Sequence, residues 1–459
     1  MQDVLLYILG ILIIVIGLAV SIGLHEIGHL LPAKLFGVKV TQYMIGFGRT
    51  LFSRRKGETE YGVKAIPLGG YVAMTGMYPP DKPGEAPRSS TTGFLNSVAT
   101  EGSPAPARGR IAAIVDEARE ASADTIAEGE DHRAFYRLPV WKKIVIMLGG
   151  PFMNLVLAFV FFAILVTGFG IPQNTTTLGS VSECLVPATS QATSCAADDP
   201  AAPAAAAGLL PGDHIVALDG KAVPPWEALR ATISASPGAT INVEFVRDGE
   251  TMDLSLTPVA NERALYDAAG KPVLAADGSA KTELVGMIGA TPTSELVSQP
   301  LSAVPGYVGE NVAQVGNMIL HLPQRMVDIW NAAFGAEARS ADGPISVVGV
   351  GRLAGEIVSL DEAPVASKVQ AMVGLLASLN VALFVFNLIP LMPLDGGHIA
   401  GALYEGLRRF LAKLFGRPDP GPVDTAKMVP IPFVVTIVLG AISLRPVYAD
   451  LVKPVSPFG

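Results

Sequence analysis

Four long runs of hydrophobic residues dominate the pattern of this chain. They cover residues 4–24, 144–169, 371–389 and 428–444. The first run has 21 residues without a formal charge, and a helix of that length spans about 31 Å, close to the thickness of the hydrocarbon core of a bilayer. The fourth is short and contains Pro430 and Pro432. The pattern predicts a polytopic α-helical membrane protein with about four spans.

The first run could instead be a cleaved signal peptide. Such a peptide has a positively charged start, a short apolar region and a small-residue cleavage site. This chain starts Met1-Gln2-Asp3, and its apolar run is longer than that region. We therefore expect the first run to be a retained membrane span.

Composition agrees with a membrane protein and excludes two other classes. Of the 459 residues, 50% are hydrophobic and 16% are charged, and the mean hydropathy is +0.44. The net charge of −8, without a long basic stripe, excludes a nucleic-acid-binding protein. Two cysteines are too few for a domain held together by disulfides.

Lys and Arg residues near the ends of the spans predict the orientation. Lys34 and Lys39 follow the first span, Lys142 and Lys143 precede the second, and no Lys or Arg occurs from 144 to 220. Basic residues return after the third span. We expect the first and third loops to be cytoplasmic, and the loop over about 170–370 and both termini to be extracytoplasmic, in the inner (plasma) membrane of a cell.

The first loop has the pattern of a β-hairpin followed by a long polar stretch. Residues 50–53 and 61–66 flank a turn-like segment at 55–58, which favours a membrane-associated hairpin. Pro, Ser, Gly and Thr dominate residues 79–110, which is typical of a disordered linker. Residues 111–126 could form a weakly packed helix.

The long loop between the second and third spans predicts a compact domain. A strand at 214–218 precedes a helix at 226–234, and Asp248-Gly249 lies between strands at 240–246 and 251–256, a strong hairpin signal. This order resembles a PDZ domain, which binds peptides by adding a strand to a sheet edge. A small β-rich domain without a peptide ligand remains the alternative.

Two further features of this loop carry expectations. Cys184 and Cys195 are the only cysteines and lie in an oxidising compartment, so we expect a disulfide, with two free thiols as the alternative. Residues 300–334 have the periodicity of a pair of amphipathic helices. That pair could lie on the outer membrane surface or pack against the outer domain.

The segment His25-Glu26-Ile27-Gly28-His29 is the most informative motif. On a helix, residues i and i+4 share a face, so both imidazoles can hold one metal ion. Glu26 is offset by about 100°, where it can take a proton from a zinc-bound water, whose pKa is about 7. The alternative is a polar cap on a helix end, but such a cluster at a hydrophobic span is costly unless it has a function.

A zinc site needs a third protein ligand, and Asp395 is the best candidate. His132, His214 and His321 are poorly placed, whereas His398 is possible. His25 lies 21 residues after the extracytoplasmic end of the first span, and Asp395 lies 24 residues after that of the third span. These similar counts predict that both residues lie at a similar depth in the membrane, near the cytoplasmic side. An Asp-Gly-Gly sequence alone usually marks only a turn.

These motifs together resemble the site-2 protease family of intramembrane zinc metalloproteases, in the bacterial branch with one PDZ domain. The motif at His25–His29 on a first span is followed by Asn387-x-x-Pro390-x-x-Pro393-Leu394-Asp395-Gly396 on a later one. Further similarity lies at Gly46-Phe47-Gly48, Gly149-Gly150-Pro151 with Asn154, and Gly343-Pro344-Ile345. The resemblance covers most of residues 1–78, 137–260 and 340–450, and residues 79–131 have no counterpart.

The resemblance implies cleavage of membrane-spanning protein substrates, such as anti-sigma factors or remnant signal peptides. It implies that His25, His29 and Asp395 bind Zn²⁺, that Glu26 is the general base, and that Asn387 donates a hydrogen bond to the substrate backbone or oxyanion. The PDZ-like domain would bind a peptide or substrate segment and exclude intact substrates.

The predicted layout follows the chain from the first span to the C-terminal tail. It comprises 1–36, a first span with the zinc motif; 37–78, a cytoplasmic membrane-associated β-hairpin; 79–136, a largely disordered cytoplasmic linker; 137–170, a second span; 175–260, an extracytoplasmic PDZ-like α+β domain; 261–340, a connector with amphipathic helices; 341–400, a third span with the Asp motif; and 401–459, a cytoplasmic loop, fourth span and tail.

Two other functions have to be weighed. Intramembrane His, Glu and Asp also mark the ion paths of metal or proton transporters, although the internal repeats common in transporters are missing from this sequence. A catalytically inactive PDZ scaffold is the third class. The presence of the base and of three ligands in the sequence argues against it.

Overall fold

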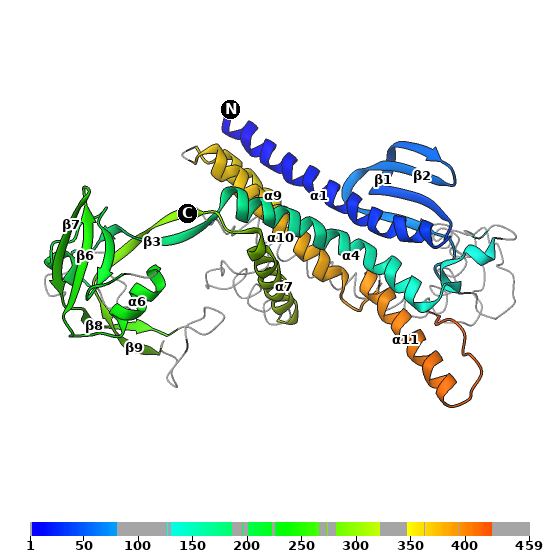
Figure 1. The fold of residues 1–459 in the computed structure, drawn as a ribbon. Coiled ribbons are helices and arrows are strands. Elements are labelled where there is room, and N and C mark those ends of the chain that lie inside the picture. The colour runs from blue at the N-terminus through cyan, green and yellow to red at the C-terminus, as the bar shows by residue number, and fades with distance from the viewer. Residues whose placement is uncertain are drawn as a thin grey trace, which may run out of the picture. The chain divides into compact units, whose positions relative to one another are not determined.

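The computed structural model describes residues 2–79, 126, 130–185, 195, 201–222, 225–265, 273, 281–321, 347–361, 363–392 and 394–424. The chain forms two compact units (Figure 1). The helical unit combines Met1–Gly168 with Pro300–Gly459, and the β-rich unit is Phe169–Gln299. Most of the predicted linker, the second helix of the amphipathic pair and the fourth apolar run lie outside the described residues.

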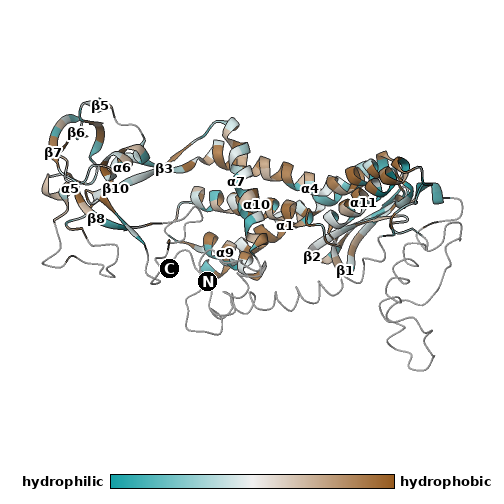
Figure 2. Cartoon of the chain, turned by 90° about the horizontal axis from the view of Figure 1, so that it is seen from below, coloured by the Kyte–Doolittle hydropathy of each residue, from teal (hydrophilic) through white to brown (hydrophobic). Residues whose placement is uncertain are grey.

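Three helices of the helical unit are long and apolar enough to cross a membrane. They are α1 (Gln2–Leu35), α4 (Val140–Ala163, continued by a π-helix at Ile164–Phe169) and α10 (Val365–Asn387). Figure 2 shows hydrophobic residues along much of their length. Three of the four predicted spans are thus present as helices, in a membrane protein that also contains β-sheet.

The backbones of α1 and α4 touch where Gly28 meets Gly149. A Cβ atom on Gly28 would lie 2.1 Å from the carbonyl oxygen of Gly149, and a Cβ on Gly149 would lie 1.9 Å from that of Gly28. Any side chain at either position would push the helices apart. Small residues at a helix crossing allow this close approach in membrane proteins.

Further helices surround this pair. The helix α9 (Val347–Ser359) packs on α1, and Ala354 and Ile357 are buried beside Ile14. The helix α7 (Val304–Leu320), the first of the predicted amphipathic pair, contacts α4 and α10 within the helical unit. On α10, Asn380 Nδ2 donates to Ser21 Oγ of α1 across 3.0 Å, and both side chains are buried.

The helix α11 (Asp395–Leu414) covers the start of the segment predicted as the loop after the third span. It packs on α4, and its buried residue Glu405 pairs with Lys143 of that helix. Large apolar side chains on its other face are exposed, among them Leu403, Leu407 and Phe410. Charged residues between them obscured the helical period in the sequence.

The predicted hairpin is present, but its strands are longer and doubly paired. They are β1 (Val40–Lys56) and β2 (Thr59–Met74). Residues 42–45 of β1 pair with 70–73 on one side and with 60–63 on the other, and β1 bends at Gly46 and Gly48, whose φ angles are 91° and 83°. Tyr43 anchors the sheet to α1 by donating its hydroxyl proton to the carbonyl of Gly23 across 2.8 Å.

The β-rich unit contains a sheet with the strand order β10-β3-β4-β6-β7, to which β5 adds beside β4. A separate pair joins β8 to β9. The elements are β3 (Ile171–Val181), α5 (Pro203–Ala206), β4 (His214–Leu218), β5 (Lys221–Ala222), α6 (Trp226–Ser234), β6 (Ile241–Arg247), β7 (Glu250–Leu256), β8 (Val259–Ala264), β9 (Thr282–Met287) and β10 (Ala290–Val297).

Several local predictions for this unit are confirmed. The strand β4 and the helix α6 have the predicted bounds, and the turn between β6 and β7 uses Asp248 and Gly249 with φ angles of 52° and 85°. Cys184 and Cys195 form the expected disulfide. The unit nevertheless continues past the predicted boundary at 260, because β10 returns from residue 290 to pair with β3.

Candidate metal centre

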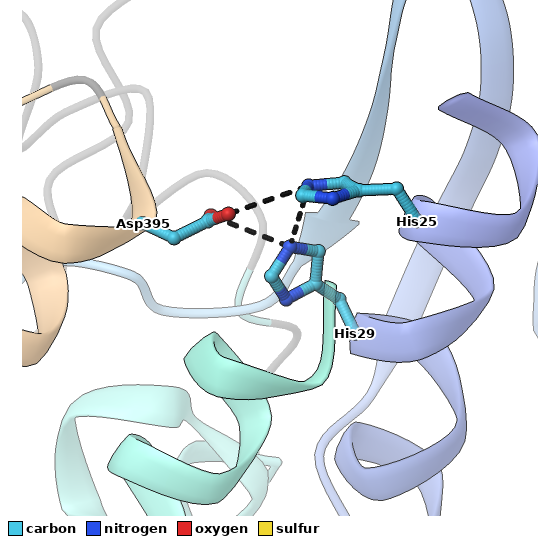
Figure 3. Close-up of side chains that lie close together, drawn as sticks. All are labelled: His25, His29 and Asp395. Atoms are coloured by element: carbon cyan, nitrogen blue, oxygen red, sulfur yellow. Dashed lines mark hydrogen bonds and ion pairs between the residues drawn. The ribbon is translucent and has the colours of Figure 1, made fainter. Parts of the chain in front are cut away.

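Two histidines and one aspartate converge in the helical unit (Figure 3). His25 and His29 lie one turn apart on α1, and Asp395 is the first residue of α11. The Nε2 atom of His25 lies 3.3 Å from Asp395 Oδ2, and the Nε2 atom of His29 lies 3.3 Å from Asp395 Oδ1. The two Nε2 atoms are 3.2 Å apart. The structure therefore brings the predicted ligand residues together from segments that are distant in the chain.

The segment after α10 places Asp395 against α1. The helix α10 ends at Asn387, and the chain turns tightly before α11 begins. A Cβ atom on Gly396 would lie 2.3 Å from the carbonyl oxygen of Ile389, and one on Gly397 would lie 2.6 Å from the amide nitrogen of Met392. The two glycines after Asp395 thus let the turn fold back over the start of α11.

These residues fit a zinc ion. The three side chains offer one ligand atom each within 4.8 Å of one another. Gly150 of α4 borders the same space, and a Cβ atom there would lie 2.2 Å from His29 Nε2 and 2.7 Å from His25 Nε2. The missing side chain leaves room beside both nitrogens. Two imidazoles and one carboxylate are the donor set of a zinc site that keeps a fourth position open.

One cavity of about 290 Å³ is lined by all five predicted site residues, which are His25, Glu26, His29, Asn387 and Asp395. Glu26 is 8% exposed, and Asn387 stands at the end of α10. The cavity is lined by His25, Glu26, His29, Gly70, Tyr71, Val72, Met74, Met77, Met147, Asn387, Asp395 and His398. His398, which the sequence left as a possible ligand, lines the cavity, while the ligand atoms that come together belong to His25, His29 and Asp395.

The edge of the β1–β2 sheet is a part of the site that sequence reasoning missed. Gly70, Tyr71 and Val72 of β2 line the cavity. A Cβ atom on Gly70 would lie 2.9 Å from Cγ of Glu26, so only glycine lets the strand approach this carboxylate so closely. The Gly69-Gly70 pair was the available signal, but its distance from the His motif in the sequence hid the contact.

Polar groups of α4 also contact the two histidines. Nδ1 of His29 lies 2.8 Å from the carbonyl oxygen of Ile146, and Nδ1 of His25 lies 3.0 Å from Asn154 Nδ2. The Asn154 side chain is fully buried. In the sequence, Asn154 stands out as a polar residue within an apolar run. The sequence does not show which residue Asn154 contacts.

Comparisons with known proteins agree with this site. Residues 13–415 match the model of Peptidase family M50. The chain is 32% identical over 463 residues to the zinc metalloprotease Rip1 of Mycolicibacterium smegmatis, covering 98% of this chain and 99% of the relative. It is 29% identical over 462 residues to Rip1 of Mycobacterium tuberculosis H37Rv, covering 99% and 100%. It is 27% identical over 402 residues to the metalloprotease MmpA of Caulobacter vibrioides, covering 85% of each chain.

The family match spans the segments that carry the metal centre, since residues 13–415 include the end of α1, α4, α10 and the start of α11. The relatives are named as metalloproteases, and this likeness does not support the transporter hypothesis. The chain belongs to peptidase family M50, the site-2 protease family, and is an intramembrane zinc metalloprotease.

Proposed function

We propose that His25, His29 and Asp395 hold the zinc ion of this protease, with Glu26 as general base and Asn387 as a hydrogen-bond donor to the substrate. The convergence of two imidazoles and one carboxylate within 3.3 Å, inside the cavity that also contains Glu26, carries this proposal. Bound zinc would supply a Lewis acid that polarises a carbonyl group and makes water acidic.

Glu26 is suited to move the protons of the reaction. It follows His25 directly on α1, so its carboxylate points into the cavity beside the ligands and not toward the ligand position itself. Hydrolysis adds hydroxide to the carbonyl carbon and a proton to the amine nitrogen that leaves. The Glu26 carboxylate would accept the proton of the attacking water and then deliver it to that nitrogen.

Asn387 is suited to bind the substrate. It is the last residue of α10 and lines the cavity without belonging to the group of ligand atoms. An amide nitrogen is a poor zinc ligand and a good donor to a carbonyl oxygen. Its Nδ2 would stabilise the negative charge that develops on that oxygen during attack.

The substrates would be membrane-spanning proteins, such as anti-sigma factors or remnant signal peptides. The ligands lie near the ends of apolar helices, next to the basic residues Lys34 and Lys143. The excess of Lys and Arg around this end favours a cytoplasmic position for the active site. By the same rule, the β-rich unit and both chain ends would be extracytoplasmic, in a multi-pass inner membrane protein.

The β-rich unit would act as a PDZ-like module that binds a peptide or substrate segment. Its order of strand β4, helix α6 and hairpin β6–β7 supports this assignment. Trp226, Leu229 and Ile233 of α6 are buried against the sheet in the core of the unit. A peptide could add to a sheet edge, as in PDZ domains, and so select which membrane proteins reach the active site.

Cleavage of a membrane-spanning reporter by the full chain in proteoliposomes tests the proposal. Zinc content is measured on the same preparations. Glu26→Gln should keep zinc and lose cleavage, whereas His25→Ala should lose both. Cleavage that survives in Glu26→Gln, or full zinc in His25→Ala, would contradict the assigned roles.

A further inference from the structure

Each histidine of the metal centre has a second ring nitrogen, and α4 contacts both of them. Nδ1 of His29 lies 2.8 Å from the carbonyl oxygen of Ile146. A carbonyl oxygen can only accept, so Nδ1 of His29 carries a proton, and in the neutral ring Nε2 has its lone pair free for a metal ion. The tautomer of His29 is therefore fixed by the backbone of α4 in the form that binds a metal.

The second nitrogen of His25 meets a side chain instead. Asn154 Nδ2 lies 3.0 Å from His25 Nδ1, and the Asn154 side chain is fully buried on α4. Its Oδ1 atom accepts no hydrogen bond in the described part of the chain. Nδ2 can only donate, so this pairing puts the proton of a neutral His25 on Nε2, which is the atom that faces Asp395 and would have to bind the metal.

A half turn of the Asn154 amide about its Cβ–Cγ bond exchanges the positions of Nδ2 and Oδ1. The two groups are nearly equal in size, so the exchange needs no additional space. Oδ1 then accepts the proton of His25 Nδ1, and Nε2 of His25 has a free lone pair. One rotation thus places an acceptor beside His25 Nδ1, and Nδ2 takes the place that Oδ1 had.

We propose that Asn154 is a positioning residue for the metal centre, which holds His25 in its metal-binding tautomer through Oδ1. This inference rests on the ligand role proposed for His25. A metal-binding histidine commonly donates its other N–H to a carbonyl or carboxylate, and loss of such a partner weakens metal binding.

The position of Asn154 on α4 supports this role, because the same face of the helix contacts both ligand histidines. Ile146, Gly150 and Asn154 are spaced four residues apart and lie along one face of the helix. Ile146 contacts His29, Gly150 leaves room beside both Nε2 atoms, and Asn154 contacts His25. One stripe of α4 thus supports both rings, while the ligands themselves come from α1 and α11.

The test is the affinity of the full, detergent-solubilised chain for Zn²⁺, measured by competition with a chelator. Asn154→Leu removes the acceptor at similar volume and should weaken zinc binding by about 10- to 100-fold. Asn154→Asp restores an acceptor and should bind zinc at least as tightly as the unsubstituted chain. Absorption of the Co²⁺-loaded chain reports whether the ligand geometry is kept.

Asn380→Leu is the matched control. Asn380 is also fully buried and also bonds α1, through Ser21, but it is not in contact with a ligand histidine. A general loss of helix contacts would weaken zinc binding equally in both Leu variants. The proposal predicts a loss in Asn154→Leu alone, in protein whose helix content by circular dichroism is unchanged.

The outcomes separate this inference from the proposed function. Full zinc affinity in Asn154→Leu, or an equal loss in Asn154→Asp, overturns the role of Asn154. If Asn154→Leu does not fold, Asn154→Asp decides alone, and a tenfold weaker affinity in that variant overturns the role. His25→Ala is measured in parallel. If His25→Ala keeps zinc, the ligand assignment fails. If His25→Ala loses zinc and Asn154→Leu keeps it, only the inference about Asn154 fails.

Discussion

Lys143 and Glu405 form a buried ion pair that joins α4 to α11 across 262 residues of sequence. The Lys143 Nζ atom donates to both carboxylate oxygens, at 3.0 and 2.8 Å, and the two side chains are 6% and 3% exposed. Glu405 also accepts from Arg409 and from the amide of Val423. The pair fixes the helix whose first residue is Asp395.

Removal of Glu405 should therefore destabilise the chain more than removal of Lys143. Glu405→Leu leaves the Lys143 ammonium buried without its partner, which costs about 3–5 kcal/mol. Lys143→Met leaves Glu405 with Arg409 and Val423 and should cost less. The double variant should recover part of the loss, because no buried charge is left unpaired at Lys143. Thermal unfolding in detergent measures all three, and equal losses in the two single variants would contradict the asymmetry.

Gly150→Ala should abolish zinc binding without unfolding the chain. The added methyl group would occupy the space beside both Nε2 atoms, while alanine itself favours a helix by about 0.5–1 kcal/mol over glycine. Gly374→Ala on α10 is the control, since a Cβ atom there meets only ordinary contacts with Leu165, at 3.8 and 3.9 Å. Zinc content and melting temperature are measured together. Normal zinc content in Gly150→Ala would show that the metal lies elsewhere.

Asp395→Ala and Asn387→Ala should separate metal binding from catalysis. Loss of the carboxylate ligand should lower zinc content and cleavage together. Loss of the amide donor should keep zinc and reduce single-turnover cleavage by about a hundredfold or more, because one such donor is worth about 3–4 kcal/mol. Near-normal cleavage in Asn387→Ala would leave that residue only a packing role.

In the β-rich unit, Asp213 should stabilise the fold in a pH-dependent way. Burial would raise the pKa of this carboxyl, but hydrogen bonds from Arg247 and from the amide of Leu210 outweigh it and hold the pKa below its ordinary value. Its stabilisation is then complete at neutral pH, persists down to the ordinary pKa of about 3.8, and is lost as the pH falls through the lower folded value.

Asp213→Asn should remove this dependence and cost about 1–3 kcal/mol at pH 7, because Arg247 loses a charged partner. Hydrogen exchange of β4 and β6 amides in the full chain, corrected for intrinsic rates, reports the loss. Asp253→Asn on β7, an exposed carboxylate, is the control. Equal exchange in the two variants would contradict the role of the Asp213–Arg247 pair.

Excision of the β-rich unit should broaden substrate choice without abolishing cleavage. Ile171 at the start of β3 pairs with Val297 at the end of β10, so Gly170 can be joined to Ser298 by a short linker. A cut at residue 260 would instead leave β10 without its partner strand. The shortened chain should bind zinc and cut reporters that the full chain rejects. A shortened chain that binds zinc and cuts nothing would make the unit necessary for catalysis.

Features set by neighbouring residues were predictable from the sequence. The spacing of His25 and His29 fixes their shared face on a helix, and the Asp248-Gly249 turn fixes a hairpin, because both depend on local backbone geometry. The similar depth of His25 and Asp395 followed from counting along apolar runs, and the structure places them 3.3 Å apart.

Features that depend on distant partners were not predictable in this way. The double pairing of residues 42–45 depends on where β2 folds back, and β10 finds β3 across more than a hundred residues. The contact of Asn154 with His25 depends on how α1 crosses α4. A single sequence shows that an Asn stands in an apolar run but not which helix it faces.

The backbone contact between Gly28 and Gly149 fixes the point at which α1 and α4 cross. Two helices that touch at their main chains cannot come closer, but they can pivot about the contact like crossed rods. Because Gly28 and Gly149 are next to His29 and Gly150 in sequence, such a pivot would change the distances near the metal ligands least and those at the far helix ends most. The metal ligands thus lie beside the point of the α1–α4 crossing that a change of crossing angle would displace least.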